Sequence, residues 1–118
     1  MRNLLFLVLC VFMVSCSNNP VPKPENLLDE EVMTDMLFDI AILQAAEGTM
    51  AHRLAENNIK ANTFIYKKYK IDSITFYQNQ KYYAGETRKY KKMHQIVLDR
   101  LEEVKAANEI KKDSVLPK

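Results

Sequence analysis

The chain is poor in cysteine and in long apolar runs, and each shortage excludes a class of structure. Of its 118 residues only Cys10 and Cys16 are cysteines. Beyond Cys16, therefore, no thiol is available for a disulfide, a catalytic nucleophile or a cysteine metal site. A membrane-spanning helix needs roughly 20 apolar residues, and no such run follows residue 16.

Glycine is also scarce, occurring only at Gly48 and Gly85. No segment alternates apolar and polar residues as a half-buried strand does, whereas apolar residues recur at helical spacing. We therefore expect an all-α protein. It should contain a small helical domain of about four helices, with short second and third helices and a long last helix.

The amino terminus follows the pattern of a lipoprotein signal peptide. Arg2 supplies a basic start, and residues 4–14 form an apolar run of eleven residues. The tetrapeptide MVSC, residues 13–16, overlaps the end of this run and places Cys16 just after it. Eleven residues suit a signal peptide better than a spanning helix. We expect residues 1–15 to be cleaved and Cys16 to carry lipid. A buried amino-terminal helix, an uncleaved anchor and an ordinary secretion signal are the alternatives.

The lipid on Cys16 would hold the protein to a membrane. Each buried methylene contributes about 0.8 kcal/mol, and stable attachment takes more than one acyl chain. Ser17 after the cysteine resembles outer-membrane sorting rather than inner-membrane retention. The predicted location is the cell envelope, on the periplasmic face of the outer membrane.

Residues 16–26 are expected to be the lipidated cysteine and a proline-rich linker. Pro20, Pro22 and Pro24 favour an extended chain that rises about 3.1 Å per residue, so that ten residues could reach roughly 30 Å from the membrane. The helical domain should cover 27–108, followed by a frayed tail over 109–118.

Helix boundaries within the domain follow from capping residues and apolar spacing. The first helix is expected over about 30–47, with Gly48 as its end or as a weak point before a piece near 50–56.

Three further helices should follow. Asn62 or Thr63 should cap a short helix through Tyr69. Asp72 and Ser73 should start another helix, which Gly85 ends as a C′ glycine. Its apolar face is expected to carry Phe76, Tyr77 and Tyr83. The longest helix should start at Thr87, with a stripe of Tyr90, Met93, Val97, Leu101 and Val104.

The segment FIYKKYKIDSITFYQNQKYYAG, residues 64–85, carries a resemblance to a known family. Its Lys68-Tyr69 turn, Ile71-Asp72-Ser73 cap and Tyr82-Tyr83 pair resemble small Bacteroidota lipoproteins with a domain of unknown function of the DUF4296 type. The acidic start near Met36 and the closing helix are similar too, so that the resemblance covers roughly residues 22–106. The chain departs from the family pattern at Gln44, where the family often carries a carboxylate. The resemblance implies a fold and a location, but no activity.

Residues that could support catalysis or metal binding are few and scattered. Asp35 and Asp39 lie on one helix face, and paired carboxylates can share a proton or bind a cation. His52 and His94 each lack the Glu-x-x-His arrangement of helical-bundle metal sites. Ser73 is better explained as a helix cap than as a nucleophile. We therefore expect no catalytic residue, no metal, no cofactor and no enzymatic activity.

Charge is unevenly distributed along the chain. Without Arg2, 16 basic residues face 15 acidic ones, which argues against a polyanion binder, so we expect no nucleic-acid partner. Residues 25–56 hold eight acidic side chains, whereas residues 67–92 hold eight basic ones. Cations at a helix start are unfavourable, and a basic cluster occupies the start of the last helix: Arg88, Lys89, Lys91 and Lys92. These side chains are either solvated or paired with the acidic first helix, or they form a surface for an anionic partner.

Six tyrosines lie within residues 66–90. Neighbouring side chains on a helix diverge by about 100°, so Tyr82 and Tyr83 cannot both be buried on one face. The sequence leaves two arrangements open, a tyrosine-rich core and an exposed tyrosine-and-lysine patch. In the second case Tyr82 and Tyr83 would join the basic cluster as a binding surface, because aromatic residues concentrate binding energy.

Two functions are consistent with these features. The first is a periplasmic binding or adaptor module that recruits a protein partner in the cell envelope through the tyrosine-and-lysine surface. The alternative is a structural accessory lipoprotein that forms a homo-oligomer or packs into an envelope complex through apolar surface on the last helix. A hydrolase or a metal-dependent enzyme is a third hypothesis, for which the sequence shows no converging set of residues.

Overall fold

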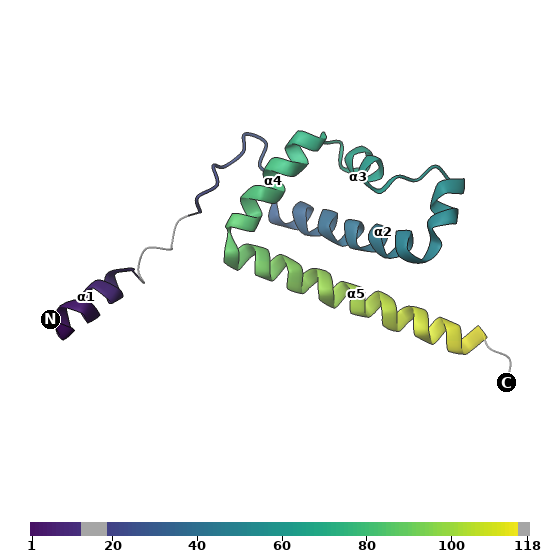
Figure 1. Cartoon of the computed structure of the whole chain (residues 1–118). Coiled ribbons are helices and arrows are strands. Elements are labelled where there is room, and N and C mark those ends of the chain that lie inside the picture. The colour runs from purple at the N-terminus through teal and green to yellow at the C-terminus, as the bar shows by residue number, and fades with distance from the viewer. Residues whose placement is uncertain (13–18, 116–118) are drawn as a thin grey trace.

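The computed structural model describes residues 1–12 and 19–115, and these contain five helices and no strand. The helices are α1 (Arg2–Phe12), α2 (Glu30–Glu56), α3 (Ala61–Tyr69), α4 (Ser73–Gly85) and α5 (Thr87–Val115) (Figure 1). The all-α prediction is confirmed, including the long last helix. Cys16 and the residues on either side of the predicted cleavage point lie outside the described residues.

Helix α1 is apolar, and its side chains are exposed from Leu4 to Val8. This exposure contradicts the alternative of a buried amino-terminal helix within the domain. Among the described residues, none of the helices combines the length and the apolar character that crossing a membrane requires.

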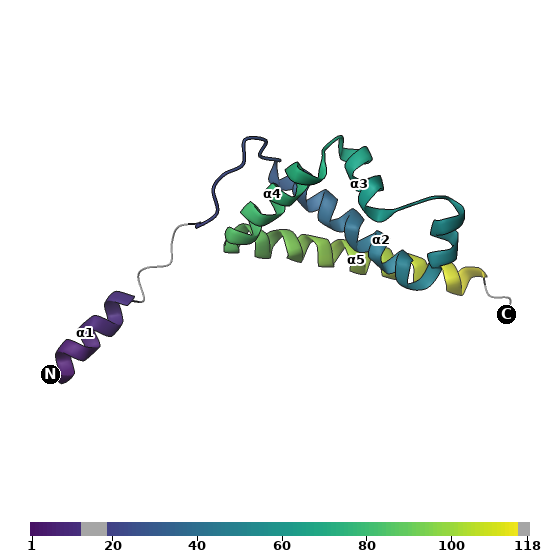
Figure 2. The ribbon, with the colours of Figure 1, turned by 45° about the horizontal axis from the view of Figure 1, so that its top comes forward.

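The domain is built on a parallel pair of long helices. Helices α2 and α5 lie side by side and run in the same direction (Figures 1 and 2). Helices α3 and α4 connect the end of α2 to the start of α5. Two ion pairs mark the register, from Glu30 to Lys89 at 3.1 Å and from Asp35 to Arg100 at 2.6 Å. Between α2, α4 and α5 the core forms around Met33, Tyr83 and Met93.

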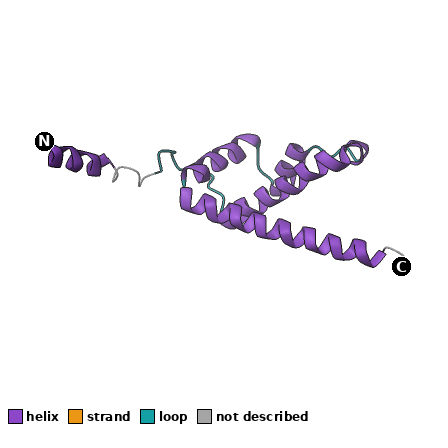
Figure 3. Cartoon of the chain, turned by 60° about the horizontal axis from the view of Figure 1, so that its bottom comes forward, coloured by secondary structure: helices purple, strands orange, loops and turns teal. Residues whose placement is uncertain are grey.

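The stripe predicted on α5 is buried only along its first half. Met93 and Val97 are buried and Leu101 is half-buried, whereas Val104 is 38% exposed. The helix continues to Val115, well into the predicted frayed tail, but every residue of 102–115 is exposed. We call residues 102–115 the C-terminal arm; Figure 3 shows it extending away from the other helices.

Helix α2 bends near its end. The chain stays helical past Gly48 and leaves helical geometry at Met50, where φ is −135° and ψ is 35°. The predicted weak point is thus correct within two residues, and the piece predicted near 50–56 is the turned end of α2. Thr49 contributes to the bend, because its hydroxyl donates to the carbonyl of Ala45 at 3.0 Å and such back-bonding distorts helices.

The caps of the short helices match the sequence in part. Asp72 is the N-cap of α4, and its carboxylate accepts from the Thr75 N–H at 2.7 Å. The cap predicted at Asn62 or Thr63 is wrong: α3 already starts at Ala61, after an extended Lys60 whose carbonyl accepts from the Phe64 N–H. Both polar residues therefore lie inside its first turn.

Tyr77 does not share the face of Phe76 and Tyr83. Tyr83 is buried at 2% exposure and Tyr77 is 66% exposed. Phe76 and Tyr83 are seven residues apart and align on a helix, whereas Tyr77 is rotated by about 100° from Phe76. The grouping predicted from the sequence was wrong for this one residue.

We expect Asp72→Ala to destabilise α4 in a pH-dependent way. The hydrogen bond with Thr75 lowers the pKa of the Asp72 carboxyl below its usual value, so its stabilisation is present above the unfolded-state pKa and is lost as pH falls through the folded-state pKa. Thermal unfolding followed by circular dichroism should show a lower Tm for the variant at pH 7. The difference between the two Tm values should shrink as the pH falls through the folded-state pKa of Asp72. A difference that does not change as the pH is lowered would contradict this role of the charged cap.

The segment before α2 is not a free spacer over the residues that the structure describes. Residues 19–28 lie along α4 and are bonded to it near both ends of the segment. At the first end, the Asn19 side chain donates to the carbonyl of Tyr82 at 2.9 Å. At the second, the Asn79 side chain accepts from the Leu28 N–H and donates to the carbonyl of Asn26, both at 2.8 Å. We call residues 19–28 the strap.

Gly85 ends α4 as predicted, but for a different reason. Its φ is not positive, so it does not act as a left-handed C′ residue. Instead, a Cβ at this position would overlap the side-chain amide of Asn19. The glycine allows the strap to approach the end of α4 closely.

Candidate functional site

The tyrosines of the predicted binding surface lie in or against the core. The Tyr83 hydroxyl donates to the carbonyl of Leu28, and burial raises the pKa of Tyr83. Tyr82 packs edge-on against Tyr83, with 5.5 Å between ring centroids, and is partly buried. The prediction that Tyr83 contributes to an exposed patch is therefore wrong, because the residue is 2% exposed and belongs to the core between α2, α4 and α5.

The four residues of the basic cluster differ in their contacts. Lys89 pairs with Glu30 of α2, and this contact raises the pKa of Lys89. The side chains of Arg88, Lys91 and Lys92 are exposed. None of these three forms an ion pair with a carboxylate in the described part of the chain. Intramolecular pairing thus accounts for Lys89, and three bases stay available at the corner where α4 meets α5.

The two carboxylates that could have formed a shared site each have their own partner. Asp35 accepts from Arg100 at 2.6 Å. Asp39 accepts from Tyr69 at 2.6 Å and pairs with Lys68. Burial, together with the bond to Asp39, raises the pKa of the Tyr69 hydroxyl above its usual range. These contacts tie α2 to α3 and α5, which is a structural role.

The two histidines lie on different helices, His52 on α2 and His94 on α5. His94 packs edge-on against Tyr90 at 4.3 Å between ring centroids, and His52 lies on the exposed turned end of α2. Across residues 1–12 and 19–115 no group of three or more potential ligands comes together.

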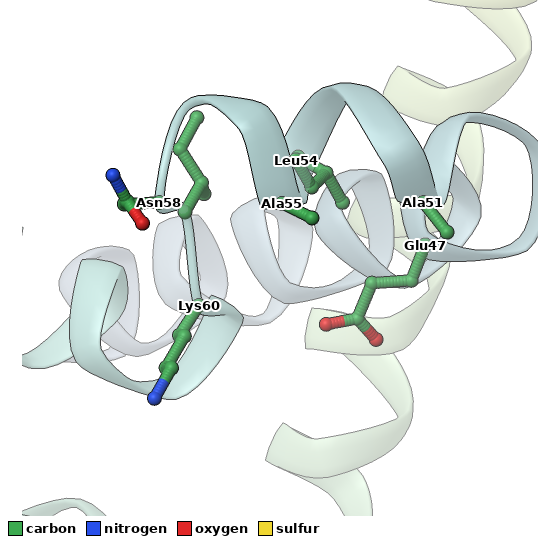
Figure 4. A pocket seen from close by; sticks show the side chains of 7 residues that line it. Glu47, Ala51, Leu54, Ala55, Asn58 and Lys60 are labelled. Carbon is green, nitrogen blue, oxygen red and sulfur yellow. The ribbon is translucent and has the colours of Figure 1, made fainter.

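An open groove runs across the face formed by α2, α3 and α4. At one end, a depression of about 360 Å³ lies between the turned end of α2 and the loop that follows it. Figure 4 shows Glu47 and the small side chain of Ala51 at one end and Lys60 at the other, with Ala55 between them. A second depression of about 580 Å³ shares Glu47, Ile59 and Lys60 with the first and continues past Gln44 to Phe76.

The groove ends in an exposed aromatic patch on α3 and α4. A third depression, of about 650 Å³, shares Asn62 and Phe76 with the second. Tyr66 of α3 packs against Phe76 of α4 at 6.0 Å between ring centroids. Beside them Ile74 and Tyr77 are 64% and 66% exposed. We call the three connected depressions the α2–α4 groove.

Sequence reasoning missed this groove. Ile74 and Tyr77 are three residues apart and therefore adjacent on a helix face, which could have marked an exposed apolar pair. The groove itself depends on the bend at Met50, which turns the end of α2 toward the loop before α3. Its lining is apolar or neutral apart from Glu47 and Lys60. Such a surface suits an extended or helical segment of another protein better than a small charged substrate.

A family model for a domain of unknown function, DUF4296, matches residues 24–107. The chain belongs to the DUF4296 family. The match includes the α2–α4 groove and the three free bases of α5, but not Asn19 or most of the C-terminal arm. No curated protein and no solved structure matches the chain. Membership in the DUF4296 family assigns no reaction and no ligand.

Proposed function

We propose that this DUF4296 protein is a lipid-anchored, non-enzymatic adaptor of the bacterial cell envelope that binds a protein partner in the α2–α4 groove. The anchor is Cys16, and the location is the periplasmic face of the outer membrane. The resemblance to Bacteroidota lipoproteins and the exposed apolar α1 support a secreted, lipidated chain.

The exposed pair Ile74 and Tyr77 carries the adaptor proposal. Large aromatic and aliphatic side chains provide most of the binding energy in protein interfaces, and these two are well exposed beside the packed Tyr66–Phe76 pair. This arrangement replaces the tyrosine-and-lysine patch predicted from the sequence, because Tyr82 and Tyr83 belong to the core cluster. No cofactor is part of the proposal.

Photo-cross-linking in intact cells tests the adaptor. The full chain would carry benzoylphenylalanine at Tyr77, and a matched control would carry it at Gln95, an exposed residue of α5. We expect one heterologous protein to be cross-linked from position 77 and not from position 95. Ile74→Asp should reduce this adduct by about tenfold or more, as expected for an interface hot spot. The absence of any adduct at position 77 would contradict the proposed partner surface.

Self-assembly is the second candidate, and the C-terminal arm favours it. Ile110 is 70% exposed and Val115 is 79% exposed, and no other described element covers them. An uncovered helix carrying apolar residues can pair with a second copy. A cross-linker at Ile110 distinguishes the two functions, because self-assembly yields a covalent dimer of the chain from that position, whereas the adaptor yields none.

A further inference from the structure

The strap fixes the lipid anchor close to one corner of the domain. The Asn19 amide donates to the carbonyl of Tyr82 at 2.9 Å and to the carboxylate of Glu86 at 3.2 Å. Its side-chain oxygen accepts from the Val21 N–H at 3.0 Å. The Asn19 amide nitrogen therefore bonds two groups at the end of α4, in the space that Gly85 leaves free, while its oxygen bonds the strap.

The other end of the strap is held by buried groups. Asn79 is fully buried, and its side chain bonds the backbone of both Asn26 and Leu28. Tyr83 adds a bond to the Leu28 carbonyl. With both ends bonded to α4, the described part of the linker cannot swing away from the domain without breaking several hydrogen bonds.

Chain length then limits where the anchor can be. Two residues separate Cys16 from Asn19, and consecutive Cα atoms are 3.8 Å apart, so the two Cα atoms are within about 11 Å of each other. A free ten-residue spacer would allow roughly 30 Å. A lipid on Cys16 therefore holds the corner between α4 and α5 at the membrane surface.

The same corner carries the three free bases. Arg88, Lys91 and Lys92 fall within about 100° on one face of α5, opposite the buried Met93 and Val97. They lie within about 9 Å, along the helix axis, of Glu86, which bonds Asn19. Of the acidic groups nearby, Glu86 is bonded by Asn19 and Glu30 is paired with Lys89. Glu31 of α2 lines the same depression as Lys92 without forming an ion pair with it.

We propose that this basic corner docks on an anionic phospholipid surface, with the phosphate groups of the lipids bound by Arg88, Lys91 and Lys92. The inference rests on the proposed lipid anchor at Cys16 and adds an orientation to it. The turned end of α2 and the C-terminal arm lie at the end of the domain opposite this corner (Figure 1). Docking therefore directs them away from the bilayer.

Quenching by lipids with a nitroxide in the headgroup tests the orientation. The full lipidated chain would carry a fluorophore at Gln95→Cys or at Ile110→Cys, in phosphatidylcholine vesicles with or without phosphatidylglycerol. We expect phosphatidylglycerol to increase quenching at position 95 and to leave position 110 unquenched. Reversing Arg88, Lys91 and Lys92 to Glu should shift the docking equilibrium by more than about a hundredfold, because loss of the three bases alone accounts for that factor.

The matched control reverses three exposed bases of the C-terminal arm, Lys105, Lys111 and Lys112, to Glu. It should leave quenching at position 95 unchanged. Equal quenching at both positions would overturn the docking proposal, and so would quenching at position 95 that persists in the Arg88, Lys91 and Lys92 variant. Neither result would contradict the lipid anchor at Cys16. A chain whose amino terminus carries no lipid by mass spectrometry would overturn the anchor and, with it, this inference. Circular dichroism would confirm that each triple variant keeps its helices.

Discussion

A Cys16→Ala variant of the full chain is expected to lose its acyl chains and its stable attachment to the membrane. Two acyl chains bury many methylenes at about 0.8 kcal/mol each, so their loss exceeds the effect of any single side-chain contact. Mass spectrometry of the amino terminus and extraction of membranes at high salt would measure the result. The wild type should resist extraction, because salt weakens only electrostatic binding.

Cys10→Ala is the matched control for that experiment. Cys10 lies within the apolar run of the predicted signal peptide, so its replacement should leave processing and lipidation unchanged. Lipid still present on the Cys16→Ala chain, or lost from the Cys10→Ala chain, would show that the acceptor has been assigned to the wrong residue. The two variants together separate the acceptor cysteine from a general requirement for a thiol.

Asn79→Ala is expected to cause the largest loss of stability of the substitutions considered for the folded domain. Asn79 is fully buried and bonds three backbone groups, the N–H of Leu28 and the carbonyls of Asn26 and Thr75. Alanine removes all three hydrogen bonds at a site that is only partly accessible to water, and each bond contributes about 0.5–1.5 kcal/mol. For a domain of this size the Tm should fall by more than about 10 °C.

Gln78→Ala provides the control for Asn79→Ala. Gln78 is the neighbouring residue on α4 and is exposed, so its replacement should change the stability by less than about 0.5 kcal/mol. Urea unfolding followed by circular dichroism would compare the two. Similar midpoints for Asn79→Ala and the wild type would mean that the strap does not contribute to the stability of the domain.

Local features of this fold were accessible from the sequence. The all-α class, the Asp72 cap and the start of α5 at Thr87 depend on spacing and on residues within a few positions. The prediction that the basic stretch pairs with the acidic first helix was correct for Lys89 and Glu30. Because acidic and basic residues are concentrated in different parts of the chain, few partners were possible.

Specific long-range contacts were not accessible. A proline-rich stretch predicts an extended chain but not the surface that it lies on, and the contact of Asn19 with Tyr82 spans 63 positions. Asn79 looked like an ordinary polar residue of α4, since nothing in its neighbourhood indicates that it bonds Asn26 and Leu28. Gly85 was correctly placed at a helix end. A glycine that adopts a positive φ and a glycine that leaves room for a neighbouring side chain cannot be told apart in a sequence. The α2–α4 groove depends on the bend at Met50 and on the position of α3 beside α2. Local sequence patterns predict neither of these.

If the chain is exported as proposed, the parallel arrangement of α2 and α5 determines when the domain can fold. Met33 packs near Met93, sixty positions later in the chain, and contacts this distant form slowly. A polypeptide that crosses a membrane amino terminus first presents α2 to the receiving compartment before α5 has emerged. Met33 and Met36 are then exposed to solvent until transport is complete, which invites association with other unfolded chains. Under the proposed export, the core between α2 and α5 is completed only when the last helix is released, and we expect a holding chaperone to protect the emerging chain until then.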